Sequence, residues 1–134
     1  MVAPSRLETV GTFAALSVEQ RQALADAFDE VDVPAGERIT SQGDFAYEFF
    51  IIEEGTAHVE QDGETIATLG PGDCFGEIGL LATGRRTAAV IAETPMLMLA
   101  MFDQSFRRFD REVPEFADLV RARMRDCFSR PATY

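Results

Sequence analysis

The sequence has few of the residues on which metal and nucleophilic catalysis depend. Its 134 residues include one histidine, two cysteines and no tryptophan. A catalytic metal needs a cluster of histidines and carboxylates, and an iron–sulfur cluster needs four ligands, most often cysteines. His58 and the two cysteines cannot supply either set, and no serine, histidine and aspartate form a recognisable nucleophile arrangement. We therefore predict that the protein is not an enzyme and has no metal site and no cofactor.

The sequence also lacks closely spaced cysteines and long apolar runs. Cys74 and Cys127 do not have the spacing of a metal-binding pair, and we interpret them as reduced thiols. No apolar run approaches the roughly 20 residues that span a membrane. Residues 1–5 lack the charged and then apolar layout of a signal peptide. These features predict a cytoplasmic protein that does not associate with a membrane.

Positive charge is scarce and unevenly placed. The formal net charge is −11, and all twelve basic residues are arginine. This acidic excess argues against nucleic acid as a direct partner, because binding to phosphate backbones depends on clustered positive charge. Nine of the arginines follow residue 84. The simplest interpretation of this arginine-rich segment is a solvated helix face.

The N-terminal part of the chain has a helical pattern. Ser17 is followed three residues later by Gln20, which is the arrangement of a capping box. Apolar residues then recur at helical spacing, at Leu24, Ala27, Phe28 and Val31. The pattern predicts a helix over 18–30, within a helical lead-in over 10–30.

The middle of the chain, from 31 to 102, has short apolar runs separated by turn residues. Such spacing is typical of a β-sandwich or a small barrel. Asp62-Gly63 predicts a tight hairpin turn between neighbouring strands. Because side chains alternate along a strand, Ala57, Val59, Ala67 and Leu69 are expected on one face of this hairpin.

Helical spacing returns after residue 102. Asp103 is predicted to cap a helix through about Arg111, and Pro114 to occupy the first turn of a last helix. The fold class is therefore α+β: one domain over 1–134 with an N-terminal helix, an antiparallel jelly-roll β-barrel over 31–102 and two C-terminal helices over 103–128. The apolar stripe of the last helix covers only about two heptads, which indicates a monomer or a weak homodimer. That stripe consists of Phe109, Val113, Phe116, Val120 and Met124.

The stretch over 75–90 carries the main chemical signal. Its first half is rich in glycine and holds one carboxylate, Glu77, at the start of an expected helical turn. Backbone N–H groups at a helix start bind anions, and the guanidinium of Arg86 can add two parallel hydrogen bonds to a phosphate. A carboxylate beside that anion site can accept a hydrogen bond from a sugar hydroxyl. The combination suggests a ribose joined to one phosphate.

Together these motifs resemble the cyclic-nucleotide-binding domains of bacterial cAMP-receptor transcription factors, cyclic-nucleotide-dependent kinase regulatory subunits and cyclic-nucleotide-gated channels. The resemblance covers about 10–128, and its core is the phosphate-binding cassette over 75–88. It implies that Arg86 pairs with the phosphate, that Glu77 accepts from the ribose 2′-hydroxyl, and that Thr87 permits cAMP and cGMP. The implied ligand-binding residues are Gly76, Glu77, Ile78, Gly79, Leu80, Arg86 and Thr87.

The resemblance also implies how the base is held. Val59, Ala67 and Leu69 would form an apolar wall, and a residue of the final helix would cover the base as a lid. The lid position of the channels aligns with Cys127, and Arg123, Phe128 or Arg130 could replace it. His58 alternates away from Val59, so we expect it to have a solvent-facing structural role.

We therefore predict a non-catalytic sensor that binds cAMP, or cGMP, and regulates a protein effector that the sequence does not identify. Two alternatives remain. One is a degenerate domain that keeps the fold as a protein-interaction module, against which Glu77 and Arg86 argue. The other is a jelly-roll enzyme of the cupin type, which the shortage of metal ligands disfavours.

Overall fold

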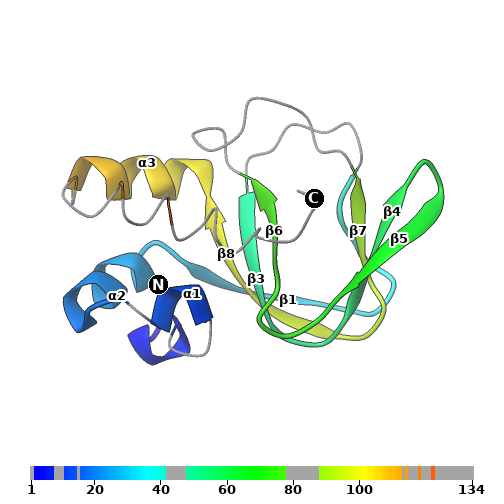
Figure 1. Cartoon of the computed structure of the whole chain (residues 1–134), viewed down its shortest axis with the longest axis horizontal. Helices are drawn as coiled ribbons and strands as arrows, with labels where there is room; N and C mark the ends of the chain where they lie inside the picture. The colour runs from blue at the N-terminus through cyan, green and yellow to red at the C-terminus, as the bar shows by residue number, and fades with distance from the viewer. Residues whose placement is uncertain are drawn as a thin grey trace.

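A computed structural model describes residues 2–7, 11–14, 16–41, 48–77 and 88–112, together with 114, 118 and 122. Within these residues, short helices come first, eight strands follow, and helix α3 follows them (Figure 1). The helices are η1 (Pro4–Leu7), α1 (Gly11–Ala14), α2 (Val18–Ala25) and α3 (Asp103–Glu112). The strands are β1 (Asp29–Val33), β2 (Arg38–Thr40), β3 (Glu48–Glu54), β4 (Ala57–Gln61), β5 (Glu64–Leu69), β6 (Cys74–Glu77), β7 (Ala89–Ala92) and β8 (Met96–Phe102).

The strands form two antiparallel sheets of four strands each. The order is β1-β8-β3-β6 in the first sheet and β2-β7-β4-β5 in the second. Figure 1 shows the helices gathered on the side of the first sheet, away from the β4–β5 hairpin. This arrangement confirms the predicted α+β class, with antiparallel strands in two sheets.

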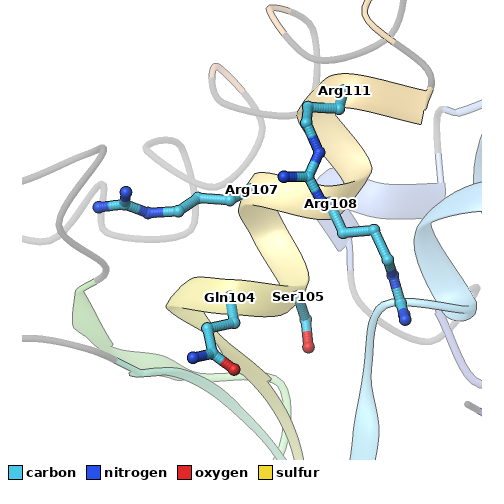
Figure 2. Close-up of a pocket in the computed structure, with 5 residues that line it drawn as sticks. All are labelled: Gln104, Ser105, Arg107, Arg108 and Arg111. Atoms are coloured by element: carbon cyan, nitrogen blue, oxygen red, sulfur yellow. The ribbon is translucent and has the colours of Figure 1, made fainter.

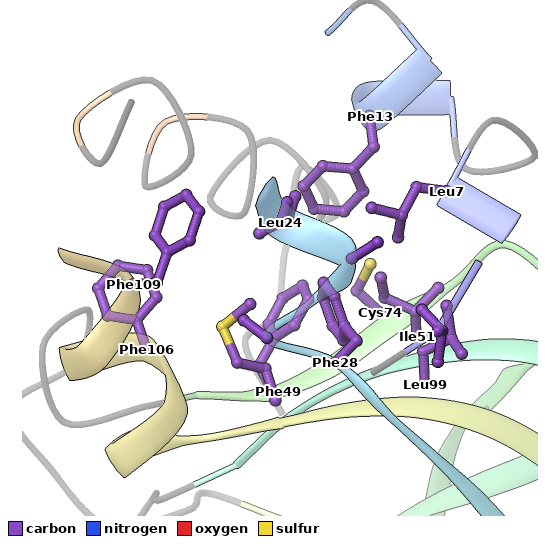
Figure 3. Packing of buried hydrophobic residues seen from close by; sticks show 14 of the residues in the cluster. Leu7, Phe13, Leu24, Phe28, Phe49, Ile51, Cys74, Leu99, Phe106 and Phe109 are labelled. Atoms are coloured by element: carbon purple, nitrogen blue, oxygen red, sulfur yellow. The ribbon is translucent and has the colours of Figure 1, made fainter. Parts of the chain in front are cut away.

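Strands β3 and β8, in the middle of the first sheet, are buried on both faces, which explains their continuous apolar runs. Alternate residues of β3 point to opposite sides, so that Phe49 and Ile51 belong to one buried cluster and Phe50 and Ile52 to another. We call the cluster beneath the helices the helical-side core and the cluster between the two sheets the barrel core. Figure 3 shows side chains of the helical-side core, with Phe106 and Phe109 coming from α3.

Helix α2 begins as predicted but ends earlier. The Ser17 hydroxyl accepts from the Gln20 N–H at 3.1 Å, and the Gln20 side chain accepts from the Ser17 N–H at 2.9 Å. The helix ends at Ala25 rather than at residue 30, because the chain turns and β1 pairs with β8 from Asp29 onward. Phe28 keeps its place in the core although it lies outside the helix.

The N-terminal segment is attached to the first sheet by Arg6. Its guanidinium donates to both oxygens of Glu53, with the Nε bond at 3.0 Å, and to Glu30 at 2.9 Å. The hydrogen bond that Arg6 donates to Glu53 is the main cause that raises the pKa of Arg6 above its ordinary value. This pairing connects η1 to β3 and β1.

The predicted hairpin and the first C-terminal helix are both confirmed. Asp62 and Gly63 have φ angles of +53° and +81°, as a two-residue hairpin turn between β4 and β5 requires. Helix α3 starts at Asp103 and extends one residue past the predicted Arg111. The second predicted C-terminal helix lies mostly outside the described residues. In the described part of the chain, no helix combines the length and apolar character needed to cross a membrane.

Candidate functional site

Gly76 occupies a backbone position that only glycine adopts readily. It lies in β6, is buried, pairs with Phe49 of β3 and has a φ of +77°. An L-residue with a side chain is strained at such an angle. Gly76 was predicted to allow close approach of a ligand. Its positive φ gives a second reason for glycine at this position, which is the backbone conformation of the strand itself.

Phe75 anchors the same strand from within the barrel. Its side chain is fully buried and stacks on Phe50, with ring centroids 4.9 Å apart and planes 18° from parallel. No separate role was predicted for Phe75, although alternation along β6 could have placed it in the barrel core. The stack fixes the strand immediately before Gly76 and Glu77.

Glu77 is the last residue of β6, opposite Glu48 of β3 in the ladder. The chain is described again from Ala88, which is buried in the barrel core, and β7 follows at once. Figure 1 shows the end of β6 and the start of β7 at the same end of the barrel. The predicted ligand-binding residues Ile78, Gly79, Leu80, Arg86 and Thr87 belong to the connection between these two strands and lie outside the described residues.

The three residues predicted to form the wall against the base lie together. Val59 of β4 is opposite Ala67 of β5, and Leu69 follows on the same strand face. Val59 and Leu69 are buried in the barrel core, and the half-buried Ala67 packs against it. Phe75 and Ala88 belong to the same core. The structure therefore brings the predicted apolar wall to the residues that flank the predicted phosphate-binding segment.

The residues predicted as a lid, Arg123, Cys127, Phe128 and Arg130, lie outside the described residues, as do Val113 and Phe116.

His58 is described, and its ring lies outside the barrel core between two carboxylates. Its Nε2 lies 2.7 Å from Glu60 and its Nδ1 lies 3.3 Å from Glu93. A structural role is consistent with these contacts, although only 21% of the side chain is exposed. In the described ranges, no group of three or more histidine, cysteine or carboxylate side chains could hold a metal ion.

The prediction of reduced thiols was wrong for Cys74, which is disulfide-bonded. Cys74 lies in β6 and its side chain belongs to the helical-side core, on the face opposite to Phe75. The only other cysteine in the sequence is Cys127, which lies outside the described residues. Sequence spacing did not suggest a pair, because residues far apart in the chain give no information about their distance in the fold. The thiol argument for a cytoplasmic location therefore loses its support.

Replacing Cys74 with serine is expected to lower the free energy of unfolding by about 2–5 kcal/mol, because the cross-link no longer restricts the unfolded chain. Thiol titration of the denatured wild-type protein should find no free thiol before reduction and two afterwards. Cys127→Ser is the matched variant and should lower stability by a similar amount. Two free thiols before reduction, or a disulfide-linked dimer on a non-reducing gel, would contradict a bridge within one chain.

Comparison with known proteins identifies the type of site. Residues 30–112 match the family model described as "Cyclic nucleotide-binding domain". The chain is 39% identical over 122 residues to the cAMP-dependent protein kinase regulatory subunit of Schizosaccharomyces pombe. That match covers 90% of this chain and 29% of the relative, so the chain spans less than a third of that protein's length.

Two solved structures illustrate the range of similar folds. A putative cyclic nucleotide-binding protein from Geobacter metallireducens superposes with a TM-score of 0.81 at 21% identity, covering 96% of this chain and 97% of that one. The regulatory subunit of a cAMP-independent protein kinase A from Trypanosoma cruzi, bound to guanosine, gives a TM-score of 0.69 at 27% identity. That match covers 84% of this chain and 41% of the other.

Proposed function

Since the chain belongs to the cyclic nucleotide-binding domain family, we propose that it is a cAMP sensor that regulates a protein effector, with cGMP as a weaker ligand. The family is a ligand-binding one, and the chain is a cyclic nucleotide-binding regulatory domain similar to those of protein kinase A regulatory subunits. The choice of ligand, the residues that bind it and the effector are the proposed parts.

The observation that carries the proposal is the position of the apolar wall. Val59, Ala67 and Leu69 meet Phe75 and Ala88 in the barrel core. The segment between Phe75 and Ala88 contains both predicted polar contacts, the Glu77 carboxylate and the Arg86 guanidinium. A nucleotide has the matching parts, because its base is an apolar plane and its ribose and phosphate are polar.

Each polar residue has a distinct proposed role. Arg86 binds the exocyclic phosphate oxygens through two parallel charge-assisted hydrogen bonds. Glu77 accepts from the ribose 2′-hydroxyl and so favours a ribose over a deoxyribose. Thr87 permits either base, while backbone N–H groups of the segment over 76–80 contact phosphate or sugar oxygens. A C-terminal residue, Arg123 or Phe128, covers the base; Cys127, the third predicted candidate, is needed for the bridge to Cys74.

Strand β6 offers a route from the nucleotide to the helices. Phe75 belongs to the barrel core, whereas its neighbour Cys74 belongs to the helical-side core together with Phe106 and Phe109 of α3 (Figure 3). In our proposal, nucleotide binding shifts β6 and α3 repacks in response. The shift is driven only by the difference in nucleotide affinity between the two states. The S. pombe relative suggests a kinase as the effector.

A nucleoside is the second candidate ligand, because the similar T. cruzi structure contains guanosine. Guanosine has no phosphate and would leave Arg86 without its predicted partner. An unpaired cation in a partly buried site is unfavourable, so the presence of Arg86 favours a phosphorylated ligand.

Calorimetric titration of the whole chain with cAMP, cGMP and guanosine tests the proposal. We expect cAMP to bind most tightly, cGMP to bind more weakly and guanosine to give no measurable heat. Absence of heat with both cyclic nucleotides at high micromolar concentration, in a protein shown to be folded, would contradict the proposal and favour a protein-interaction module. Tighter binding of guanosine than of cAMP would support the nucleoside alternative.

A further inference from the structure

Helix α3 carries three arginines and three acidic residues, Asp103, Asp110 and Glu112, and the arginines gather around one pocket. Arg107, Arg108 and Arg111, with Gln104 and Ser105, line a surface pocket of about 400 Å³ (Figure 2). We call this the arginine face. The three arginines are exposed, whereas the chain as a whole has a formal net charge of −11.

The packing of α3 determines which way the arginines point. Phe106 and Phe109 are buried in the helical-side core, and residues three apart share one side of a helix. Arg107 and Arg111, four residues apart, share the other side. The apolar packing that attaches α3 to the sheet therefore directs the positive charge outward.

The end of β8 adds an apolar group directly before this helix. Phe102 is 40% exposed, one of few large apolar side chains in the described ranges that face solvent. Gln104 and Ser105 follow it in the first turn of α3. Arginine and exposed aromatic side chains are the residue types that contribute most binding energy in protein interfaces. The combination is suited to a protein partner.

The geometry of the guanidinium groups favours an extended partner over a single small anion. Figure 2 shows Arg107 and Arg108 extending to opposite sides of the helix, with Arg111 between them. One phosphate cannot contact groups that diverge in this way, whereas successive carboxylates of an acidic segment can each meet one guanidinium.

A second copy of this chain is a poor occupant. In a symmetric dimer the same surface of both copies forms the interface, so one arginine face would meet another. Like charges placed together in an interface are unfavourable. A different protein with an acidic surface has the complementary charge.

We propose that the arginine face, with Phe102 directly before its helix in the chain, is a docking surface for an acidic polypeptide segment of the effector. The inference rests on the proposed function for the existence of an effector, but not for the chemistry of the contact. Since α3 also contributes Phe106 and Phe109 to the core that contains Cys74 of β6, nucleotide binding and docking involve one helix.

The test uses a fluorescein-labelled oligoglutamate peptide and measures its anisotropy against the whole chain at low salt. We expect saturable binding that weakens as salt is added, because the contact is electrostatic. Arg111→Glu should weaken binding roughly tenfold or more, as expected for a central interface arginine. Arg38→Glu, at an exposed position of β2, makes the same charge change elsewhere and should alter affinity by less than about twofold.

Calorimetry with cAMP on the same samples separates this proposal from the proposed function. Arg111→Glu should retain cAMP binding, and Arg108→Glu is a second variant in case the first is poorly folded. Equal losses of peptide affinity for the α3 variants and Arg38→Glu would contradict the proposed docking surface. Absence of peptide binding to the wild-type protein would contradict it as well. Displacement of the peptide by low concentrations of tripolyphosphate would indicate a phosphate site instead. A dimer that Arg111→Glu dissociates would indicate a self-interface.

Discussion

Arg86→Ala is expected to weaken cAMP binding by on the order of 2–5 kcal/mol, which is the usual cost of removing one partner from a buried charge pair. This corresponds to at least about thirtyfold in the dissociation constant. Arg86→Lys should also weaken binding strongly, because an ammonium group cannot make two parallel hydrogen bonds to a phosphate. Calorimetric titration with cAMP measures both variants.

The neighbouring arginine provides a matched control for this experiment. Arg85 is one residue away and has the same charge, but we predict that it is solvated and does not contact the ligand. Arg85→Ala should change cAMP affinity by less than about twofold. If Arg86→Lys left the affinity unchanged, or if both alanine variants lost affinity equally, the phosphate would not be bound where we propose. Thermal melting would show whether each variant is folded.

Gly55→Ala is expected to lower the free energy of unfolding by about 2–5 kcal/mol, which combines the strain of positive φ with overpacking. Gly55 has a φ of +90°, and an added Cβ would lie 2.4 Å from the carbonyl oxygen of Pro95. It would also lie 2.9 Å from Cγ and 3.0 Å from Cα of Met96. Since two of these atoms are backbone atoms at the start of β8, a rotamer change of Met96 cannot accommodate the added methyl group.

The variant Gly36→Ala separates the cost of backbone strain from the cost of overpacking. The φ of +86° at Gly36 is almost the same, but an added Cβ would meet no atom within 4 Å. Gly36→Ala should therefore cost only about 1–2 kcal/mol, from backbone strain alone. Urea denaturation midpoints of the two variants and wild type measure the difference. Equal destabilisation would show that the turn before β8 yields to the added methyl group.

Features encoded by neighbouring residues could be predicted closely from the sequence. The capping box at Ser17, the Asp62-Gly63 turn and the start of α3 at Asp103 each depend on a few adjacent side chains. The end of α2 could not be predicted in the same way. Ala27 and Phe28 continue the helical spacing of Leu24, but they are buried in the same core from a turn. Spacing alone could not distinguish the two conformations, and pairing of β1 with β8 decided between them.

The predictions for the candidate site likewise differ in how far local sequence patterns could support them. The glycine at position 76 was predicted from a motif, and its positive φ supplies a physical reason that the motif did not contain. Alternation predicted that Val59, Ala67 and Leu69 share one strand face, and they lie together within or against the barrel core. Their contact with a base stays a prediction. Binding of a nucleotide by Glu77, Arg86 and Thr87 stays a prediction. The disulfide at Cys74 depends on a long-range contact that no local pattern encodes.

The acidic strand β1 has a consequence for solubility. It forms an outer edge of the first sheet, where the backbone of another chain could add a strand and begin aggregation. Asp29, Glu30 and Asp32 are exposed along it. Charged side chains on an edge strand oppose such pairing, and two copies approaching edge to edge would bring carboxylates together. The acidity that argues against nucleic acid thus also protects the open edge of this sheet from aggregation.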